Sequence, residues 1–207
     1  KIEISLIANF AAVHREPGHE DFEYFHTNLN GAENICKWAE ESKCDKIIFS
    51  SSIAPYGISS STKDESTIPV PVTSYGSSKL VAEKIHQAWK AKDSARSLLI
   101  IRPGVVFGPS EGGNVSRLIK AVSKGYFFYM GNKKTIKAGI YIHELCQAIT
   151  WLLECELFQS QKEVLANLCM EPGPTIEDYV NAIMKINSSK KFIFNIPKPL
   201  LLIASYS

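Results

Sequence analysis

Short apolar runs alternate along the first half of the chain with segments in which apolar residues recur every three or four positions. The runs IEISLIANFAA, KIIFSSS and SLLIIRP predict three buried strands, over residues 2–12, 46–52 and 97–103. A helix is predicted between the first two strands, and another over about residues 74–92. Apolar residues line one face of the first helix, at Phe22, Phe25, Leu29, Ala32, Cys36 and Ala39.

Strands separated by helices predict an α/β fold, a doubly wound parallel sheet with right-handed crossovers. In such sheets the ligand crevice lies beyond the carboxyl ends of the strands. Here the strands end in AAVHR, SSSIAPYG and RPGVVFGP, which supply the polar and glycine residues that a site needs. A functional site is therefore predicted at this edge of the sheet.

The alternation loosens after Gly108, where short helices are predicted near residues 115–122, 145–153 and 176–186. YFFYM, EVLANL and KFIFNI predict short strands. We interpret residues 1–110 as the sheet domain and residues 111–207 mainly as a smaller lobe over the crevice, with elements returning to the sheet. A nucleotide-binding sheet normally opens with a GxGxxG-type turn, and the sequence contains none, so we expect the N-terminal part of the fold to be missing from this chain.

The composition narrows the classes of function. A net charge of +2 gives no reason to expect a nucleic-acid partner, and Lys133, Lys134 and Lys137 are interpreted as a solvated loop. The cysteine count is odd at 5, without a CxxC pair, which favours reduced thiols in a cytoplasmic protein. The histidines form no HExxH motif, so no metal is expected, and no apolar run reaches the ~20 residues of a membrane span.

The segment YGSSK places Tyr75 and Lys79 four residues apart near the start of the second predicted helix. Residues with this spacing share a helical face, so the phenol and the ammonium point into the same cleft. A tyrosine of pKa ~10 needs roughly 4 kcal/mol of differential stabilisation to act as a base near neutral pH, and a nearby cation acts in that direction. Tyr75 is therefore a candidate base that takes a proton from a substrate hydroxyl.

The spacing alone is not specific, because a second YxxxK pair occurs at Tyr129 and Lys133. That pair spans Gly131 and Asn132, which favour a turn, so we interpret it as a chance match and its tyrosine as a packing residue. The first pair, in contrast, follows the strand end FSSSIAPYG. Ser52 in that segment is either a loop-capping hydroxyl or a donor that holds the substrate oxygen and shares its proton with the phenol.

Seven segments in order make the chain similar to the extended short-chain dehydrogenases/reductases, in the NAD-dependent sugar epimerase/dehydratase branch: NFAAVHRE, YFHTNLNGAENIC, KIIFSSSIAPYG, YGSSKLVAEK, LLIIRPGVVFGP, GGNVSRLIKAV and GIYIHEL. The resemblance is dense over about residues 8–150 and looser beyond. It implies a Rossmann-type sheet, a C-terminal substrate lobe, and Ser52, Tyr75 and Lys79 as catalytic residues. NAD is the implied cofactor. NADP stays open, because the residue that contacts the adenosine ribose would lie in the missing first half.

The same resemblance implies how the cofactor is held across the strand ends, with Pro103 and Gly104 flanking the nicotinamide. For two residues an alternative is open, because Asn28 could face solvent from its helix and His14 could be a loop residue without a ligand. The implied cofactor-binding residues are Phe10, Ala11, Ala12, His14, Asn28, Ser50, Ser51, Tyr75, Lys79, Pro103 and Gly104.

Departures from the family pattern narrow the expected reaction. The 4,6-dehydratases of this branch carry an acidic residue after the serine, whereas this chain has Ile53 and Ala54, which argues against elimination of water. Val105 replaces an asparagine that contacts the sugar nucleotide in many epimerases. Lys137 replaces an arginine that binds diphosphate, and it keeps the charge without the bidentate fork. The implied substrate-binding residues are Ser52, Asn114, Val115 and Lys137.

Within the branch, the chain most resembles the epimerases of N-acetylglucosaminyl-diphospho-undecaprenol. This resemblance rests on three stretches, AA-HR, RSL-I-RP-V-FG and GNV…G-F…G. The expected function is 4-epimerisation of a diphosphate-linked sugar, nucleotide- or polyprenyl-linked, through a 4-keto intermediate. The alternatives are a keto-sugar reductase or dehydrogenase and a catalytically idle NAD-binding protein. The resemblance also implies a homodimer. Contact of the tail PKPLLLIASY with a membrane surface would follow if the sugar is lipid-linked, and a buried lobe segment is the favoured interpretation of that tail.

Overall fold

The computed structural model describes residues 3–15, 18–59, 61–188 and 192–196. The chain divides into two compact units. Unit 1 consists of Lys1–Gly104 and Leu145–Leu168, and unit 2 of Val105–Glu144 and Cys169–Ser207. The division into a cofactor-binding and a substrate-binding domain stays a prediction.

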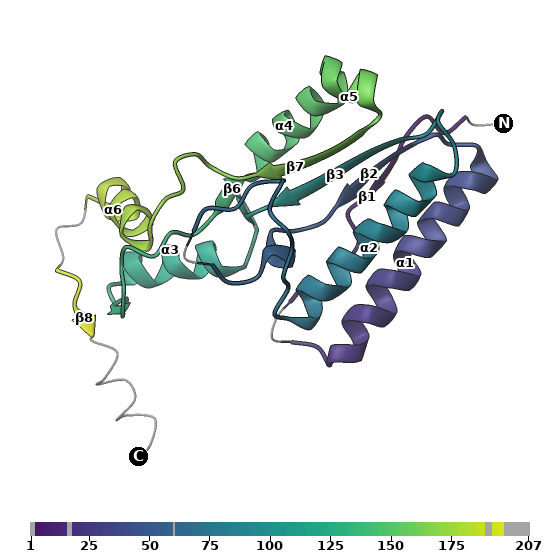
Figure 1. Ribbon diagram of the computed structural model, residues 1–207. Helices are drawn as coiled ribbons and strands as arrows, with labels where there is room; N and C mark the ends of the chain where they lie inside the picture. Colours follow the sequence, from purple (N-terminus) through teal and green to yellow (C-terminus); the bar gives the residue numbers. More distant parts are fainter. Residues whose placement is uncertain (1–2, 16–17, 60, 189–191, 197–207) are drawn as a thin grey trace. The chain divides into compact units, whose positions relative to one another are not determined.

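Unit 1 is built on a parallel sheet of strand order β1-β2-β3-β7, which confirms the predicted α/β parallel-sheet fold. Helices α1 (Asp21–Ser42) and α2 (Ser74–Ala91) lie side by side along one face of this sheet (Figure 1). The other face is covered by α5 (Glu156–Gln161) and by the part of α4 (Ile142–Glu154) that belongs to unit 1. The strands are β1 (Ile7–Asn9), β2 (Lys46–Ser50), β3 (Ser97–Pro103) and β7 (Glu163–Leu168).

The core of unit 1 explains why these segments fold as they do. β3 is buried along nearly its whole length between β2 and β7, as expected for a continuous apolar run in a parallel sheet. Small residues such as Ala32 on α1 and Ala82 on α2 are fully buried in the same cluster as Ile47 and Leu98, so the helices approach the sheet closely.

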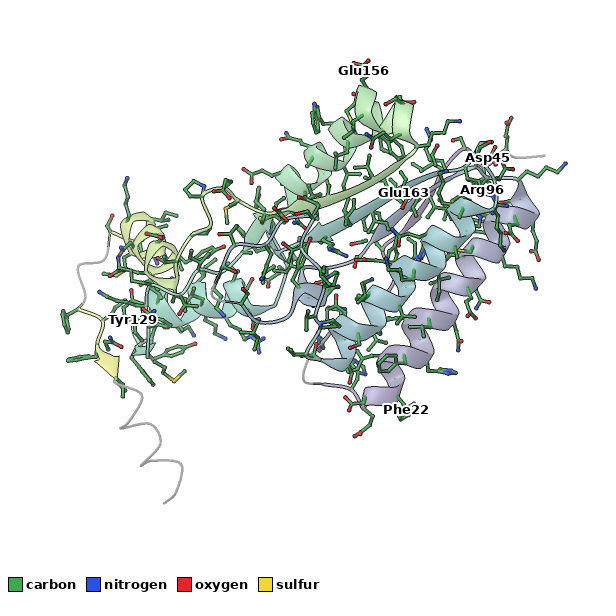
Figure 2. All side chains as sticks on the ribbon, viewed as in Figure 1. Phe22, Asp45, Arg96, Tyr129, Glu156 and Glu163 are labelled. Carbon is green, nitrogen blue, oxygen red and sulfur yellow. The ribbon has the colours of Figure 1, made fainter. Side chains whose placement is uncertain are left out.

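The predicted apolar face of α1 is partly wrong. Phe22 is 68% exposed at the start of the helix, where Figure 2 labels it. Tyr24 and Asn28 are buried instead, in line with Ala32, Cys36 and Ala39. The buried stripe therefore runs one residue before the predicted Phe25 and Leu29, which are partly buried, and it includes a polar amide that an apolar pattern cannot identify.

The two edges of the sheet differ in their side chains. Asp45 precedes β2, Arg96 precedes β3 and Glu163 opens β7, and these three lie at the amino edge, where Figure 2 labels them. The carboxyl edge carries the serines after β2 and the Pro103–Gly104 turn after β3. Because all four strands are parallel, every segment predicted to carry chemistry in unit 1 emerges at this one edge.

Unit 2 has its own small core. α3 (Asn114–Lys124) packs against α6 (Ile176–Ile186), and the buried residues between them include Val122, Tyr129 and Val180. Two short parallel pairs complete the unit: β4 (Val105–Phe107) with β6 (Gly139–Tyr141), and β5 (Tyr129–Met130) with β8 (Asn195–Ile196). The tail PKPLLLIASY lies outside the described residues. Within the described chain, no helix combines the length and the apolar character needed to cross a membrane.

Candidate active site

The segment that follows β2 is fixed against the end of β3 by its backbone. The amide of Ser51 donates to the carbonyl of Ile101 at 2.8 Å, and the amide of Ile53 donates to the carbonyl of Pro103 at 3.2 Å. A short 3-10 helix, η1 (Ala54–Tyr56), then turns the chain away. Ser52 is thereby held at the carboxyl edge of the sheet.

The hydroxyl of Ser52 serves the local turn through one of its acceptor positions. Its Oγ accepts a hydrogen bond from the amide of Ala54 at 3.1 Å, which is the loop-capping contact that serine commonly makes. A hydroxyl has one O–H donor besides its acceptor positions. The capping bond uses only an acceptor position, so the capping role and the predicted donor role are compatible.

The start of α2 lies against this loop. Thr73 caps the helix by accepting from the amide of Gly76 at 3.1 Å. A Cβ on Gly76 would lie 2.8 Å from the carbonyl oxygen of Ala54, so glycine permits this close approach. The helix therefore starts beside the residues that follow Ser52, with Tyr75 in its first turn.

Lys79 lies one helical turn after Tyr75 and reaches the tip of β2. Its Nζ donates to the carbonyl of Ser50 at 2.6 Å and lies 4.3 Å from the centroid of the Phe49 ring. The side chain is buried, at 2% exposure. Desolvation lowers the pKa of Lys79 to about 8, against the opposing effect of the Glu83 carboxylate. Lys79 is therefore still mainly a cation at neutral pH, as the predicted role requires.

Asn28 is buried, at 6% exposure, so the alternative in which it faces solvent is wrong. Its Oδ1 accepts from the amide of Val13 at 2.8 Å, and its Nδ2 donates to the carbonyl of Val13 at 3.2 Å. Nδ2 also donates to the hydroxyl of Ser78 at 2.9 Å. Asn28 thus ties the segment after β1 to α2, and its predicted contact with a cofactor stays a prediction.

The other predicted cofactor residues lie at or just beyond the strand ends. Phe10 follows β1 and is 53% exposed, and Ala11 and His14 are also exposed. Ala12, Ser50 and Gly104 are partly buried, whereas Pro103 ends β3 and is buried. Ser51 is 4% exposed, and its hydroxyl donates to Glu83 at 2.5 Å. Its side chain therefore belongs to the interior, and only its backbone remains for lining a cofactor path.

Sequence reasoning missed the buried ion pair beside these serines. Arg102 donates to Glu83 through Nε at 2.8 Å and through Nη2 at 2.6 Å, and both side chains are 3% exposed. Two signals were present in the sequence. Glu83 follows Lys79 by one turn on the buried face of the helix, and Arg102 is a charge at the end of an apolar strand.

The predicted substrate-binding residues of unit 2 lie at its surface. Asn114 begins α3 and is exposed, and its Oδ1 accepts from Nη2 of Arg117 at 2.8 Å. Val115 follows it, partly buried, and Lys137 is exposed. Arg117 is a cation that the sequence analysis did not single out. The substrate role of Asn114, Val115 and Lys137 stays a prediction.

The second YxxxK pair does not lie on a helix, and this confirms the prediction of a turn at that position. Tyr129 is a buried residue of β5, and Gly131 has a positive φ of 84°. Lys133 and Lys134 both pair with Glu177, at 2.5 and 2.6 Å. This tyrosine therefore belongs to the core of unit 2, whereas Tyr75 lies at the sheet edge.

A glycine after η1 provides a test of this loop geometry. Gly57 has a φ of 69°, and a Cβ at this position would lie 2.3 Å from the carbonyl oxygen of Val70. We expect Gly57→Ala to lower the free energy of unfolding by about 2 kcal/mol or more. Alanine is disfavoured both by the left-handed backbone and by the clash of its Cβ with the carbonyl oxygen of Val70. Urea unfolding followed by circular dichroism measures this change.

The matched control is Gly31 in the middle of α1, where an added Cβ meets no heavy atom within 4 Å. Gly31→Ala is expected to raise the free energy of unfolding by roughly 0.5–1 kcal/mol, since alanine favours helix over glycine. Equal effects of the two substitutions would contradict the described conformation of the loop around Gly57.

The parallel sheet with helices on both faces defines the class of the chain as an α/β protein of the Rossmann type. More particularly, residues 1–165 match the NAD dependent epimerase/dehydratase family, and the chain belongs to this family. The resemblance inferred from the sequence is thus confirmed.

Two curated relatives are longer than this chain. It is 34% identical to the N-acetyl-alpha-D-glucosaminyl-diphospho-ditrans,octacis-undecaprenol 4-epimerase of Escherichia coli O157:H7, over 70% of this chain and 44% of that protein. It is 39% identical to a UDP-glucose 4-epimerase of Vibrio cholerae, over 49% of this chain and 32% of that protein. The chain therefore spans less than half the length of these relatives.

Solved structures share the fold. The UDP-glucuronic acid 4-epimerase of Bacillus cereus, solved with NAD, superposes with a TM-score of 0.80 and 21% identity over 95% of this chain and 64% of that chain. The UDP-N-acetylglucosamine 4-epimerase of Bacillus cereus gives a TM-score of 0.79 and 19% identity over 94% and 68%, respectively. At this level of identity the comparison shows the fold alone, and it confirms the Rossmann-type fold class.

Proposed function

We propose that the protein containing this chain is an NAD-dependent 4-epimerase of a diphosphate-linked sugar and works through a 4-keto intermediate. One observation carries the proposal: Tyr75 and Lys79 lie one turn apart on α2, and the Lys79 ammonium is bonded to Ser50, two residues before Ser52. This arrangement combines a phenol, a cation and a hydroxyl donor at the edge where parallel sheets bind their ligands.

Each of the three side chains has a defined task. Tyr75 takes the proton of the sugar 4-hydroxyl and returns it when the keto group is reduced, which is general base and then general acid catalysis. Lys79 favours the ionised phenol through its positive charge. Ser52 donates its O–H to the sugar oxygen, because the capping bond from Ala54 occupies only an acceptor position. After the ketone turns over in the pocket, C4 would accept hydride on its opposite face, and Tyr75 returns the proton to the same oxygen.

The residues at the strand tips suit a nicotinamide cofactor. Asn28 bonds to both the N–H and the C=O of Val13 and so anchors the backbone after β1. The anchored backbone gives a fixed surface for a flat ligand. The Lys79 ammonium has three donors, of which one goes to the carbonyl of Ser50. Bound NAD would supply the hydride acceptor and donor of the reaction. NADP in its place stays an open alternative.

The substrate class follows from the relatives. Two of them are named as 4-epimerases, one of a polyprenyl-diphosphate sugar and one of a UDP sugar. The exposed Asn114 and Lys137, with Val115 beside the former, would contact the diphosphate that both substrates share. The absence of an acidic residue at Ile53 and Ala54 favours epimerisation over dehydration. A homodimer, a cytoplasmic location and contact with a membrane surface stay predictions.

The test is to purify the full-length protein and identify its bound small molecules by mass spectrometry. We expect tightly bound NAD and interconversion of the 4-epimers of a UDP- or polyprenyl-diphosphate-linked N-acetylhexosamine without added cofactor. Stoichiometric consumption of nicotinamide would instead identify a one-way keto-sugar reductase. A protein that binds NAD but converts neither substrate would support the catalytically idle alternative.

A further inference from the structure

A buried network of side chains lies next to the predicted catalytic residues and takes no part in the roles assigned so far. At its centre is the carboxylate of Glu83. Its Oε1 accepts from Ser51 Oγ at 2.5 Å and from Arg102 Nε at 2.8 Å, and its Oε2 accepts from Arg102 Nη2 at 2.6 Å. Charge-assisted hydrogen bonds to a buried carboxylate are strong and directional.

The same helix holds the tip of β2 at two successive points. Lys79 on α2 donates to the carbonyl of Ser50, and Glu83, one turn further along, accepts from the hydroxyl of Ser51. The next residue is Ser52. Because two neighbouring residues are bonded to α2, the backbone that leads into Ser52 is held against that helix.

Arg102 extends the network across the carboxyl edge of the sheet. Its guanidinium lies 4.6 Å from the ring centroid of Tyr56, and the Tyr56 hydroxyl donates to Asn167 at the end of β7 at 2.9 Å. Helix α2, the ends of β2, β3 and β7, and the short helix η1 therefore share one connected set of contacts.

Stability alone gives a poor reason for this arrangement. Burying an ion pair costs desolvation that its attraction often fails to offset, and apolar residues of similar volume are commonly as stable. Here Nη1 of Arg102 is also buried without a hydrogen-bond partner among the described residues, a further cost to the folded state. A geometric role accounts for keeping these polar groups beside the site.

We propose that Glu83, held by Arg102, is a positioning residue that fixes Ser51 and thereby the Ser52 hydroxyl in reach of the sugar oxygen and Tyr75. This inference rests on the proposed epimerase function. A misplacement of a reacting group by about 1 Å can cost roughly 10²-fold in rate. The network is therefore expected to act on kcat and to leave KM for the sugar nearly unchanged.

The first test is Ser51→Ala in the full-length, NAD-containing protein. We expect kcat to fall roughly 10- to 100-fold, with KM within about twofold and with unchanged NAD content, because only the position of the neighbouring hydroxyl changes. Ser51→Thr keeps the hydroxyl and is expected to restore most of kcat. An active wild type whose Ser51→Ala variant keeps full kcat would overturn the inference and leave the epimerase function standing. An inactive wild type would overturn the function itself.

The second test is a double-mutant cycle that separates positioning from a direct contact of Ser51 with ligand. The background is Glu83→Leu combined with Arg102→Met, which replaces the ion pair by apolar side chains and is expected to fold. In that background kcat is expected to fall as in Ser51→Ala, and adding Ser51→Ala should change it less than about twofold, because the two changes remove the same interaction. The proposal would be overturned if Ser51→Ala lowered kcat by the same factor in this background as in the wild type. It would also be overturned if the background itself kept wild-type kcat.

A readout independent of catalysis comes from Lys79. In the NAD-free protein, the 15N chemical shift of its Nζ reports its titration, and Lys79→Arg assigns the signal. The negative charge of Glu83 raises the pKa of Lys79, so Glu83→Gln, which removes this charge and leaves Arg102 in place, is expected to make Lys79 titrate at a lower pH than in the wild type. An unchanged titration would show that Glu83 does not act on the tip of β2 and would count against the proposal.

Discussion

Replacing Tyr75 by phenylalanine is expected to lower kcat for epimerisation by roughly 10²- to 10⁴-fold, the usual contribution of general acid–base catalysis. The substitution removes the group that takes the proton and preserves the aromatic ring. The ring matters for packing, since its centroid lies 6.1 Å from that of Tyr24 on α1. The fold and the bound NAD should therefore be retained, and the loss should appear in kcat under saturating sugar and in single-turnover hydride transfer.

The matched control is the other tyrosine of a YxxxK pair. Tyr129 belongs to the core of unit 2 and is 7% exposed, so Tyr129→Phe should change kcat by less than about twofold. If Tyr75→Phe also retained wild-type kcat, the assignment of the base would be wrong. Equal losses in both variants would point to a common effect on folding, which thermal unfolding of each protein would reveal.

Much of the fold could be predicted because long apolar runs and helical periodicity are local signals. The segments SLLIIRP and EVLANL coincide with β3 and β7, and the predicted helix at 176–186 coincides with α6. The first run of 11 residues contains a strand of only three, Ile7–Asn9. Strand length depends on how far the neighbouring strand extends its hydrogen bonds, and that is a tertiary property.

Two of the four short strands of unit 2 were predicted, because β5 lies within YFFYM and β8 within KFIFNI. The other two, β4 and β6, have three residues each and pair with one another, which is too short to show a period. EVLANL was identified as a strand, but its place beside β3 in the main sheet depends on a long connection through unit 2. Sequence patterns indicate that a segment is a strand more reliably than they indicate its neighbour.

In the candidate site, too, local features could be predicted from the sequence and contacts between distant segments could not. Tyr75 and Lys79 were predictable, because their shared face follows from helical geometry within five residues. Glu83 meets Arg102 and Ser51 across separations of 19 and 32 residues, which only the assembled sheet brings together. Asn28 illustrates the intermediate case. Its helix was predicted, and the two alternatives for its side chain were a cofactor contact and exposure to solvent, but its contacts with Val13 and Ser78 were not foreseen.

A second large effect is expected at acidic pH, from His86 on α2. This side chain is fully buried and stacks on the ring of Phe49 with centroids 4.2 Å apart. Its Nδ1 lies 2.7 Å from the carbonyl of Ala82, so Nδ1 carries a proton and donates. Its Nε2 lies 3.4 Å from the amide nitrogen of Asn9, which donates to it. These two contacts indicate that the imidazole of His86 is neutral, with its proton on Nδ1.

Burial lowers the pKa of His86 from 6.5 to about 4, with a smaller lowering effect of the Lys79 cation and an opposing effect of the bond to Ala82. The unfolded chain therefore binds more protons than the folded protein between these two values. It follows that the stabilisation is complete above pH 6.5 and is lost as the pH falls towards 4. The shift corresponds to about 3 kcal/mol of unfolding free energy.

We therefore expect His86→Phe, which cannot titrate, to reduce the loss of unfolding free energy between pH 7 and pH 4 by about 3 kcal/mol relative to the wild type. Urea unfolding at a series of pH values measures this difference, and the comparison of slopes removes any constant effect of repacking. Parallel pH profiles for His86→Phe and wild type would mean that folding does not lower the pKa of this imidazole, contrary to its burial and its contacts with Asn9 and Ala82.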